Sequence, residues 1–179
     1  MSDFLVRRMT AADLPGVLRV QAECYRSDLL EGMQAFASRL ALAPATCWVA
    51  TSCNEHPDLV AYLFTHPWPQ GSLPPLDGVL APSMHDDADA AALTWFVHDM
   101  AVAPAGRGAG LAMRLYEGAL QAALDAGLRH SRLIAVQSAA RWWRRLGYAP
   151  IASQADFACA DKLAGYGPDA VMMERVLAR

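Results

Sequence analysis

A glycine-rich turn that carries one arginine is the segment of this sequence best suited to ligand chemistry. The turn, PAGRGAG at 104–110, stands between a predicted strand over 93–102 and a predicted helix over 111–127. Free N–H groups in a first helical turn, together with the helix dipole, favour a bound phosphate. Glycines let the main chain approach an anion closely, and Arg107 adds a fixed positive charge. The segment therefore predicts either a phosphate-binding loop or a plain turn that joins strand and helix.

Two common phosphate-binding signatures do not fit this turn. A P-loop requires GxxxxGK followed by Ser or Thr, and that string occurs nowhere in the chain. The dinucleotide fingerprint G-x-G-x-x-G also fails, because its last position holds Leu111 when counted from Gly106 and Met113 when counted from Gly108. The loop is therefore either a plain turn or a phosphate site of another class.

The residues around the turn carry a more specific pattern. Residues 102–112, VAPAGRGAGLA, resemble the acetyl-CoA signature of the GCN5-related N-acetyltransferase (GNAT) family, with Arg107, Gly110 and Ala112 at its three defining places. Further along, the family shows an aromatic residue, three more residues and then Gly-Phe, and this chain has WRRLGY at 143–148. The two motifs at family spacing are more discriminating than either motif alone.

The resemblance implies a crevice for acetyl-CoA as co-substrate. In the family the fourth and fifth strands splay apart, and the pantetheine arm pairs with the main chain of the fourth strand. The pyrophosphate lies on the amides of the glycine loop, and Trp143 is either a channel wall or simply a core aromatic, as is its neighbour Trp142. The implied cofactor residues are Met100, Ala101, Val102, Arg107, Gly108, Ala109, Gly110, Leu111, Ala112, Met113 and Trp143.

His98 is the candidate catalytic base, because the acceptor amine must lose a proton before it attacks the thioester. Some arylalkylamine-type members of the family carry a histidine there, and an unperturbed imidazole titrates at about 6.5. The family also implies that the Met100 N–H stabilises the developing oxyanion. Asp99 is a weaker candidate, since it points to the opposite face of an ideal strand unless a bulge intervenes. Purely structural hydrogen-bonding roles stay open for both His98 and Asp99.

The proton donor for the departing thiolate is harder to place. Many family members have a tyrosine where this chain has Trp143, and an indole N–H does not act as an acid. Tyr166, in a predicted turn over 163–168, is the candidate acid. The alternatives are an unassisted thiolate and a surface tyrosine without a catalytic role. The missing tyrosine also leaves open a non-catalytic acyl-CoA-binding protein, and the loop alone would suit a binder of sugar or nucleotide phosphates.

Metal and nucleophile motifs are not convincing in this sequence. His85, Asp86, Asp87 and Asp89 gather in a predicted loop, but such spacing is typical of a solvated turn. The four cysteines form no Cys-x-x-Cys pair and indicate reduced thiols. We therefore expect no metal. His66, Trp68 and the proline-rich loop over 67–89 form either a lid on the acceptor pocket or a simple cover of the sheet.

The elements that position these residues follow from apolar periodicity. Helical spacing runs from Leu14 to Tyr25 and over 28–42, and two further runs favour a strand hairpin. The other strands are expected at 4–8, 93–102, 128–136 and 171–177, the hairpin strands at 46–52 and 59–66, and the other helices at 111–127 and 138–148. The order fits one GNAT domain over 1–179, a three-layer α/β/α fold with a central mixed, mostly antiparallel, splayed sheet.

Composition and charge limit the partners. The chain has 15 basic and 18 acidic residues, a net charge of −3, which argues against nucleic acid. With 54% hydrophobic and 18% charged residues, it can fill a sizeable core. No run approaches the about 20 apolar residues of a membrane span, and no secretory signal is recognisable, so the predicted location is cytoplasmic. The expected partner is a small-molecule or protein amine, and a homodimer stays open.

Overall fold

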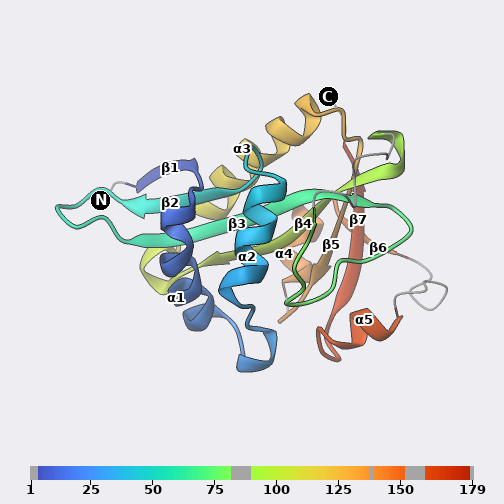
Figure 1. Cartoon of the computed structure of the whole chain (residues 1–179), viewed down its shortest axis with the longest axis horizontal. Helices are drawn as coiled ribbons and strands as arrows, with labels where there is room; N and C mark the ends of the chain where they lie inside the picture. Colours follow the sequence, from blue (N-terminus) through green and yellow to red (C-terminus); the bar gives the residue numbers. More distant parts are fainter. Residues whose placement is uncertain (1–3, 82–89, 138, 152–159, 178–179) are drawn as a thin grey trace.

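One mixed sheet with helices on both faces forms the protein (Figure 1). The computed structural model describes residues 4–81, 90–137, 139–151 and 160–177. The sheet has seven strands in the order β1-β2-β3-β4-β5-β7-β6, and only β4 and β5 pair in parallel. The strands are β1 (Phe4–Arg8), β2 (Trp48–Ser52), β3 (Leu59–Pro69), β4 (Leu93–Val102), β5 (His130–Ala135), β6 (Ala149–Pro150) and β7 (Val171–Val176).

Two separate cores lie on the two faces of the sheet, which confirms the predicted three layers. On one face, α1 (Leu14–Cys24) and α2 (Met33–Leu42) bury apolar stripes against Tyr62 and Phe64 of β3. On the other, α3 (Leu111–Asp125) and α4 (Ala140–Arg145) pack against Leu63 and Val97. The short α5 (Ala160–Ala164) precedes β7. Alternate β3 residues serve opposite cores, as expected of a strand covered on both faces.

Helix α3 starts and stops as the sequence predicts. Gly110, its N-cap residue, has a φ of +71°, and Gly127, just past its end, has a φ of +85°. Both values lie in the left-handed region that glycine adopts without steric cost. Leu111, Leu115 and Ala119 are buried along one stripe, so the helix is held by its apolar face.

Strand β3 is longer than predicted, because two prolines do not end it. Pro67 and Pro69 stay in register with Trp95 and Leu93 of β4. On its other side, β3 pairs with β2 only as far as Leu63 within the described residues. Proline nitrogens that face an unpaired edge need no acceptor, so the strand continues through them.

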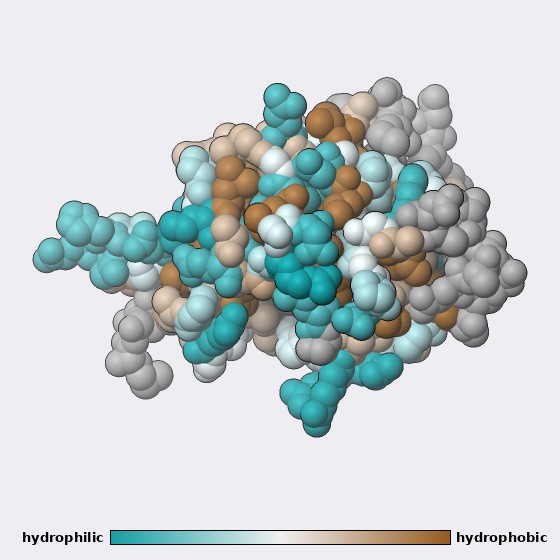
Figure 2. Space-filling model, turned by 90° about the horizontal axis from the view of Figure 1, so that it is seen from below, coloured by the Kyte–Doolittle hydropathy of each residue, from teal (hydrophilic) through white to brown (hydrophobic). Residues whose placement is uncertain are grey.

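The connection between α1 and α2 also differs from the prediction. The helix expected over 28–42 begins only at Met33, after a 3₁₀ turn over Ser27–Leu29 and Gly32 as N-cap. This leaves residues 30–32 as an extended segment over the sheet. At the far end of the molecule, the turn between β2 and β3 is a hydrophilic protrusion (Figure 2), as its turn-forming residues predict. No helix within the described residues is long and apolar enough to span a membrane.

Candidate active site

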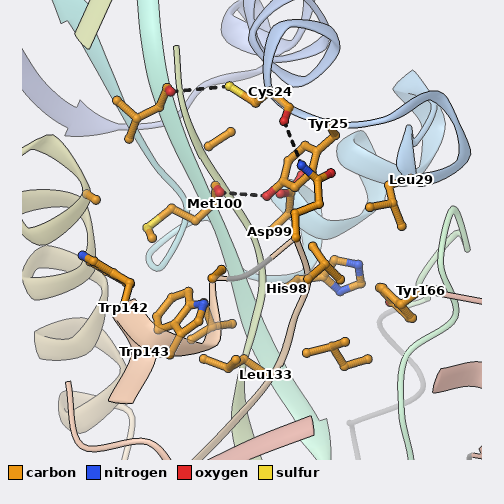
Figure 3. A pocket seen from close by; sticks show the side chains of 18 of the residues that line it. Cys24, Tyr25, Leu29, His98, Asp99, Met100, Leu133, Trp142, Trp143 and Tyr166 are labelled. Carbon is orange, nitrogen blue, oxygen red and sulfur yellow. Dashed lines mark hydrogen bonds between the residues drawn. The ribbon is translucent and has the colours of Figure 1, made fainter. Parts of the chain in front are cut away.

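Strands β4 and β5 diverge midway along β4, and a cavity lies between them. Their parallel pairing consists of Trp95 with Ser131, Phe96 with Arg132 and Val97 with Leu133. Past Val97, β4 pairs only with β3 among the described strands. The cavity has a volume of about 450 Å³, and the part of β4 after the split forms one of its walls (Figure 3). This is the splay that the family resemblance implied, and it exposes main-chain groups that no strand pairs.

The main chain of β4 faces this cavity after the split. The carbonyl of Met100 accepts a hydrogen bond from Tyr25 Oη at 2.8 Å, and that of Val102 accepts one from Cys24 Sγ at 3.4 Å. Both donors line the cavity (Figure 3). Since the N–H and C=O of one strand residue point the same way, the Met100 N–H is also directed away from β3. An extended ligand with amide groups can pair with this edge.

The glycine loop lies at the end of β4. A 3₁₀ turn over Pro104–Gly106 leads into Gly108 and Gly110, whose φ angles are +81° and +71°. The first helical main-chain bond runs from Arg114 N–H to the Gly110 carbonyl, so the three preceding amides lack an intrahelical acceptor. Arg107 lines the cavity and donates from Nε to the Val102 carbonyl at 3.4 Å. The loop therefore combines free amides, a helix N-terminus and a guanidinium beside the open edge of β4.

Replacing Gly110 by alanine is expected to lower the free energy of unfolding by about 1–2 kcal/mol, because an L side chain at positive φ is strained. The matched control is Gly71→Ala: this glycine lies outside the positive-φ set, and an added Cβ would meet nothing within 4 Å. Chemical denaturation of both variants measures the difference. Equal stability of the two variants would contradict the left-handed geometry at the start of α3.

A β-bulge puts His98 and Asp99 on the same face of the sheet. The β3–β4 register pairs Phe64 with Asp99 but Thr65 with Val97, so His98 is the extra residue. Its ring contacts His66, and Asp99 accepts a hydrogen bond from Tyr62 Oη at 2.7 Å. The exception that the sequence analysis allowed for is therefore present: the bulge adds one residue between the two registers and cancels the simple alternation for Asp99. Both side chains lie on the wall of the cavity.

When both imidazoles are neutral, a chain of hydrogen bonds determines the tautomer of His98. His66 Nδ1 lies 3.0 Å from the carbonyl of Pro67, which can only accept, so this nitrogen carries the proton. His66 Nε2, 3.0 Å from His98 Nδ1, is then the acceptor of a hydrogen bond from His98. The remaining nitrogen, His98 Nε2, is left with a lone pair and has no hydrogen-bond partner among the described residues. It lies 3.6 Å from Oε1 of Glu31.

Burial changes the acidity of both candidate bases. Burial and the charge of Arg39 lower the pKa of His98 to about 4, although Glu31 opposes the shift. The imidazole is therefore unprotonated at pH 7, rather than half-titrated as its ordinary pKa suggested. Burial and the charge of Glu31 raise the pKa of Asp99 to about 6, against hydrogen bonds from tyrosines. At pH 7 His98 is thus a neutral imidazole, and Asp99 is a carboxylate near its titration range.

A buried ion pair supports this cluster. Glu31, in the segment before α2, accepts a hydrogen bond from Arg39 Nη2 of that helix and a second one at 2.6 Å from the Asp77 N–H. Burial opposes ionisation of the Glu31 carboxyl, but His98, which is protonated at the low pH where Glu31 titrates, and Arg39 outweigh it and lower the pKa of Glu31 to about 2. The Arg39 guanidinium also lies 5.6 Å from the Phe36 ring centroid. Glu31 lines the cavity, so its carboxylate places a negative charge on the cavity wall.

The two remaining aromatic candidates lie at opposite ends of the cavity (Figure 3). Tyr166, in the turn between α5 and β7, is buried, and its hydroxyl has no hydrogen-bond partner among the described residues. Burial raises its pKa above the ordinary value, so the hydroxyl stays protonated. Trp143 packs between Tyr116 and Tyr148 and also lines the cavity. It is therefore both a core aromatic and a wall of the crevice.

The comparison with known families agrees with this geometry. The model of the family described as "Acetyltransferase (GNAT) family" matches residues 14–148. The chain belongs to this family. No curated protein matches the sequence of this GNAT chain, so its family membership rests on the matched family pattern and its fold rests on the structure.

Solved structures with the GNAT fold span more than one reaction. The NatC complex bound to Gag peptide and CoA shares 12% identity at a TM-score of 0.71, covering 98% of this chain and 99% of that one. The Escherichia coli ribosomal-protein-S18-alanine N-acetyltransferase shares 15% at 0.65, covering 99% and 96%. The GphF GNAT-like decarboxylase in complex with isobutyryl-CoA shares 16% at 0.64, covering 97% and 100%. At such identities the likeness shows the fold alone.

Several groups of this GNAT site were not found from the sequence. These groups carry no local motif: Arg39 lies in α2, Tyr62 in β3, and Tyr25 and Glu31 in the connection between α1 and α2. One signal was available: Arg39 falls on the apolar stripe of α2, three residues after Phe36, where a charged side chain must be buried. A buried arginine requires a partner, and so it predicts a nearby carboxylate.

Three further expectations from the sequence concern a lid over the acceptor pocket, a metal site and the state of the cysteines. His66 and Trp68 are buried in β3 and do not form a lid, whereas Leu76 of the following loop does line the cavity. Among the residues that the structure describes, no group of His, Cys, Asp and Glu is arranged to hold a metal ion. Cys24, Cys47 and Cys53 are free thiols. The predicted acidic turn at 85–89 and Cys159 lie outside the described residues.

Proposed function

We propose that this chain transfers an acetyl group from acetyl-CoA to a primary amine by direct attack in a ternary complex. The observation that carries the proposal is the open edge of β4, which runs directly into the glycine loop. A diphosphate-bearing thioester carrier needs both an unpaired strand edge and an anion site. Met100, Ala101 and Val102 hold the pantetheine arm, and the amides from Gly108 to Met113, together with the Arg107 guanidinium, hold the pyrophosphate. The Arg107 N–H itself donates to the Pro104 carbonyl at 3.3 Å. Trp143 forms a wall of the channel.

The chain's own groups then act on the amine and on the thioester oxygen. His98 Nε2 accepts a proton from the amine, whose nitrogen bonds to the acetyl carbon while the carbon–sulfur bond breaks. The Met100 N–H stabilises the oxygen as negative charge builds on it. Tyr166, which stays protonated, gives its proton to the departing thiolate. Asp99 is the second candidate base, and its engagement by Tyr62 favours His98.

The alternative is a GNAT-like protein that binds acyl-CoA without catalysis, because Trp143 occupies the usual place of a tyrosine. The uncovered lone pair of His98 favours catalysis, since a structural histidine would use both nitrogens. Thiol release from acetyl-CoA across a panel of primary amines, measured beside calorimetric CoA binding, separates the two. CoA binding with no thiol release from any amine would support the binding protein. Absence of CoA binding would favour a site for another phosphate.

Arg107→Glu is expected to weaken CoA binding by about 10- to 100-fold, because a charged hydrogen bond to the diphosphate is lost and a like charge is introduced. Arg8→Glu is the control, since Arg8 is exposed on β1 at the far edge of the sheet. It changes net charge by the same amount. Isothermal calorimetry gives both dissociation constants. An unchanged constant for Arg107→Glu would refute the assigned pyrophosphate site.

A further inference from the structure

We propose that the acceptor of this site is a small primary amine, bound as its ammonium ion beside Glu31 and Asp99, and not a polypeptide. The inference rests on the proposed function and names its substrate class. It depends on the balance of buried charge, on polar atoms left without partners, and on the contacts that close this end of the cavity.

Charges do not balance at the inner end of the cavity, by which we mean the part lined by Glu31, His98, Asp99 and Tyr166. Arg39 supplies one positive charge, whereas Glu31 and Asp99 supply two carboxylates. His98 adds no charge at pH 7, because its pKa lies at about 4. The other described cation on the cavity wall, Arg107, belongs to the glycine loop. A buried carboxylate without a cation is costly, and a bound ammonium ion would compensate it.

Asp99 shows the effect of this imbalance. Burial raises its pKa first, and the negative charge of Glu31 raises it further, to about 6. A cation between the two carboxylates would reverse the second effect and keep both ionised. The carboxylates of Glu31 and Asp99 would thus compensate the positive charge of a bound ammonium ion.

Unpaired polar atoms lie at the same end. His98 Nε2 and Tyr166 Oη are buried and have no hydrogen-bond partner within the described residues. Glu31 Oε1 and His98 Nε2 are both acceptors and lie 3.6 Å apart with no donor between them. An ammonium group carries three N–H donors. It would donate to both atoms. Transfer of one N–H proton to His98 Nε2 frees the nitrogen lone pair for attack, and the second N–H proton, released as the amide forms, replaces the proton that Tyr166 gives to the thiolate.

Contacts over this end of the cavity limit the size of the acceptor. Gly32 N–H donates to Asp77 at 2.6 Å, and Lys162 Nζ donates to the Leu73 carbonyl at 2.8 Å. A Cβ atom at Gly167 would come within 3.0 Å of Arg26 Nη2. The two hydrogen bonds thereby fasten the loop after β3 to the α1–α2 connection and to α5, and the turn before β7 lies against the α1–α2 connection.

This end of the cavity has apolar walls, and the cavity must hold two ligands. Leu29, Leu76 and the ring of Tyr166 line it. The pantetheine arm has to share the cavity of about 450 Å³ with the acceptor. A small amine with an apolar body fits these walls, whereas a peptide chain would need the fastened segments to separate.

Acceptor binding can be measured without catalysis by calorimetry on the full chain saturated with CoA, which has no acetyl group to transfer. The probes are methylammonium, butylammonium and phenethylammonium, with 1-butanol as the neutral counterpart and a tetrapeptide with a free N-terminus. We expect the best ammonium ion to bind at least about 10-fold more tightly than the alcohol or the peptide. Glu31→Gln should weaken this binding by about 10- to 100-fold, and Glu23→Gln, an exposed control on α1, should not.

Each contrary result overturns the inference. These results are equal binding of 1-butanol, equal binding of the tetrapeptide, no binding of any of the three ions, or unchanged affinity in a folded Glu31→Gln variant. If Glu31→Gln does not fold, the comparison of ammonium and alcohol on the unaltered protein decides. Ammonium binding without thiol release from acetyl-CoA would refute acetyl transfer and leave the ammonium site standing.

Discussion

Replacing His98 by alanine is expected to lower the turnover of acetyl transfer by about 10²- to 10⁴-fold, the range that a general base contributes. The bond to His66 leaves Nε2 of His98 as an unprotonated acceptor on the cavity side, and alanine removes it. CoA affinity should change far less, because the main chain of β4, not this side chain, holds the pantetheine arm. Steady-state thiol release at saturating acetyl-CoA and amine, together with a calorimetric dissociation constant for CoA, measures both quantities.

The control for this substitution is His130→Ala, which removes an exposed histidine at the start of β5. Because the pKa of His98 lies at about 4, its protonation should not reduce activity between pH 8 and pH 6. Activity that depends on neutral His98 should be lost only as the pH falls towards about 4. Turnover in His98→Ala equal to that of the unaltered protein would remove this residue from the mechanism.

Arg39→Met is expected to lower the free energy of unfolding by about 3–5 kcal/mol, because it leaves the buried Glu31 carboxylate without its cation. Methionine keeps much of the apolar volume of the arginine stem, so the loss reports mainly the broken pair. The variant should also raise the pKa of Glu31, since Arg39 helps to hold it low. Urea denaturation followed by circular dichroism measures the stability.

The matched control is Arg19→Met. Arg19 is exposed on α1 and makes surface ion pairs with Glu23 at 4.0 Å and Asp58 at 3.3 Å. Such pairs contribute about 0–1 kcal/mol, so this variant should unfold close to the unaltered protein. If Arg39→Met lost no more stability than Arg19→Met, the buried pair would not anchor the connection between α1 and α2.

The parts of the fold that the sequence predicts are those specified locally. Helix α3 has its apolar stripe, its glycine N-cap and its glycine stop within one continuous segment. The glycine loop is likewise contained in seven residues, so its place between strand and helix follows from the chain itself. The family motifs add the splay of the sheet, which no periodicity in β4 or β5 reveals.

The polar half of the site could not be predicted in this way, because it is assembled from distant segments. His66 and His98 meet across the β3–β4 ladder, and Glu31 reaches them from a connection that sequence periodicity assigned to a helix. The bulge at His98 is a property of the pairing of two strands, not of either strand alone. The shift of the His98 pKa follows from burial, which only the tertiary structure determines.

The prolines at the end of β3 also bear on how the protein behaves in concentrated solution. Past Leu63, the side of β3 that faces away from β4 has no strand beside it within the described residues. An open strand edge invites association with another polypeptide through main-chain hydrogen bonds. Pro67 and Pro69 present no N–H group there, so an incoming chain cannot complete a ladder along this margin. The same two residues that lengthen the strand thus oppose association of another strand along this edge.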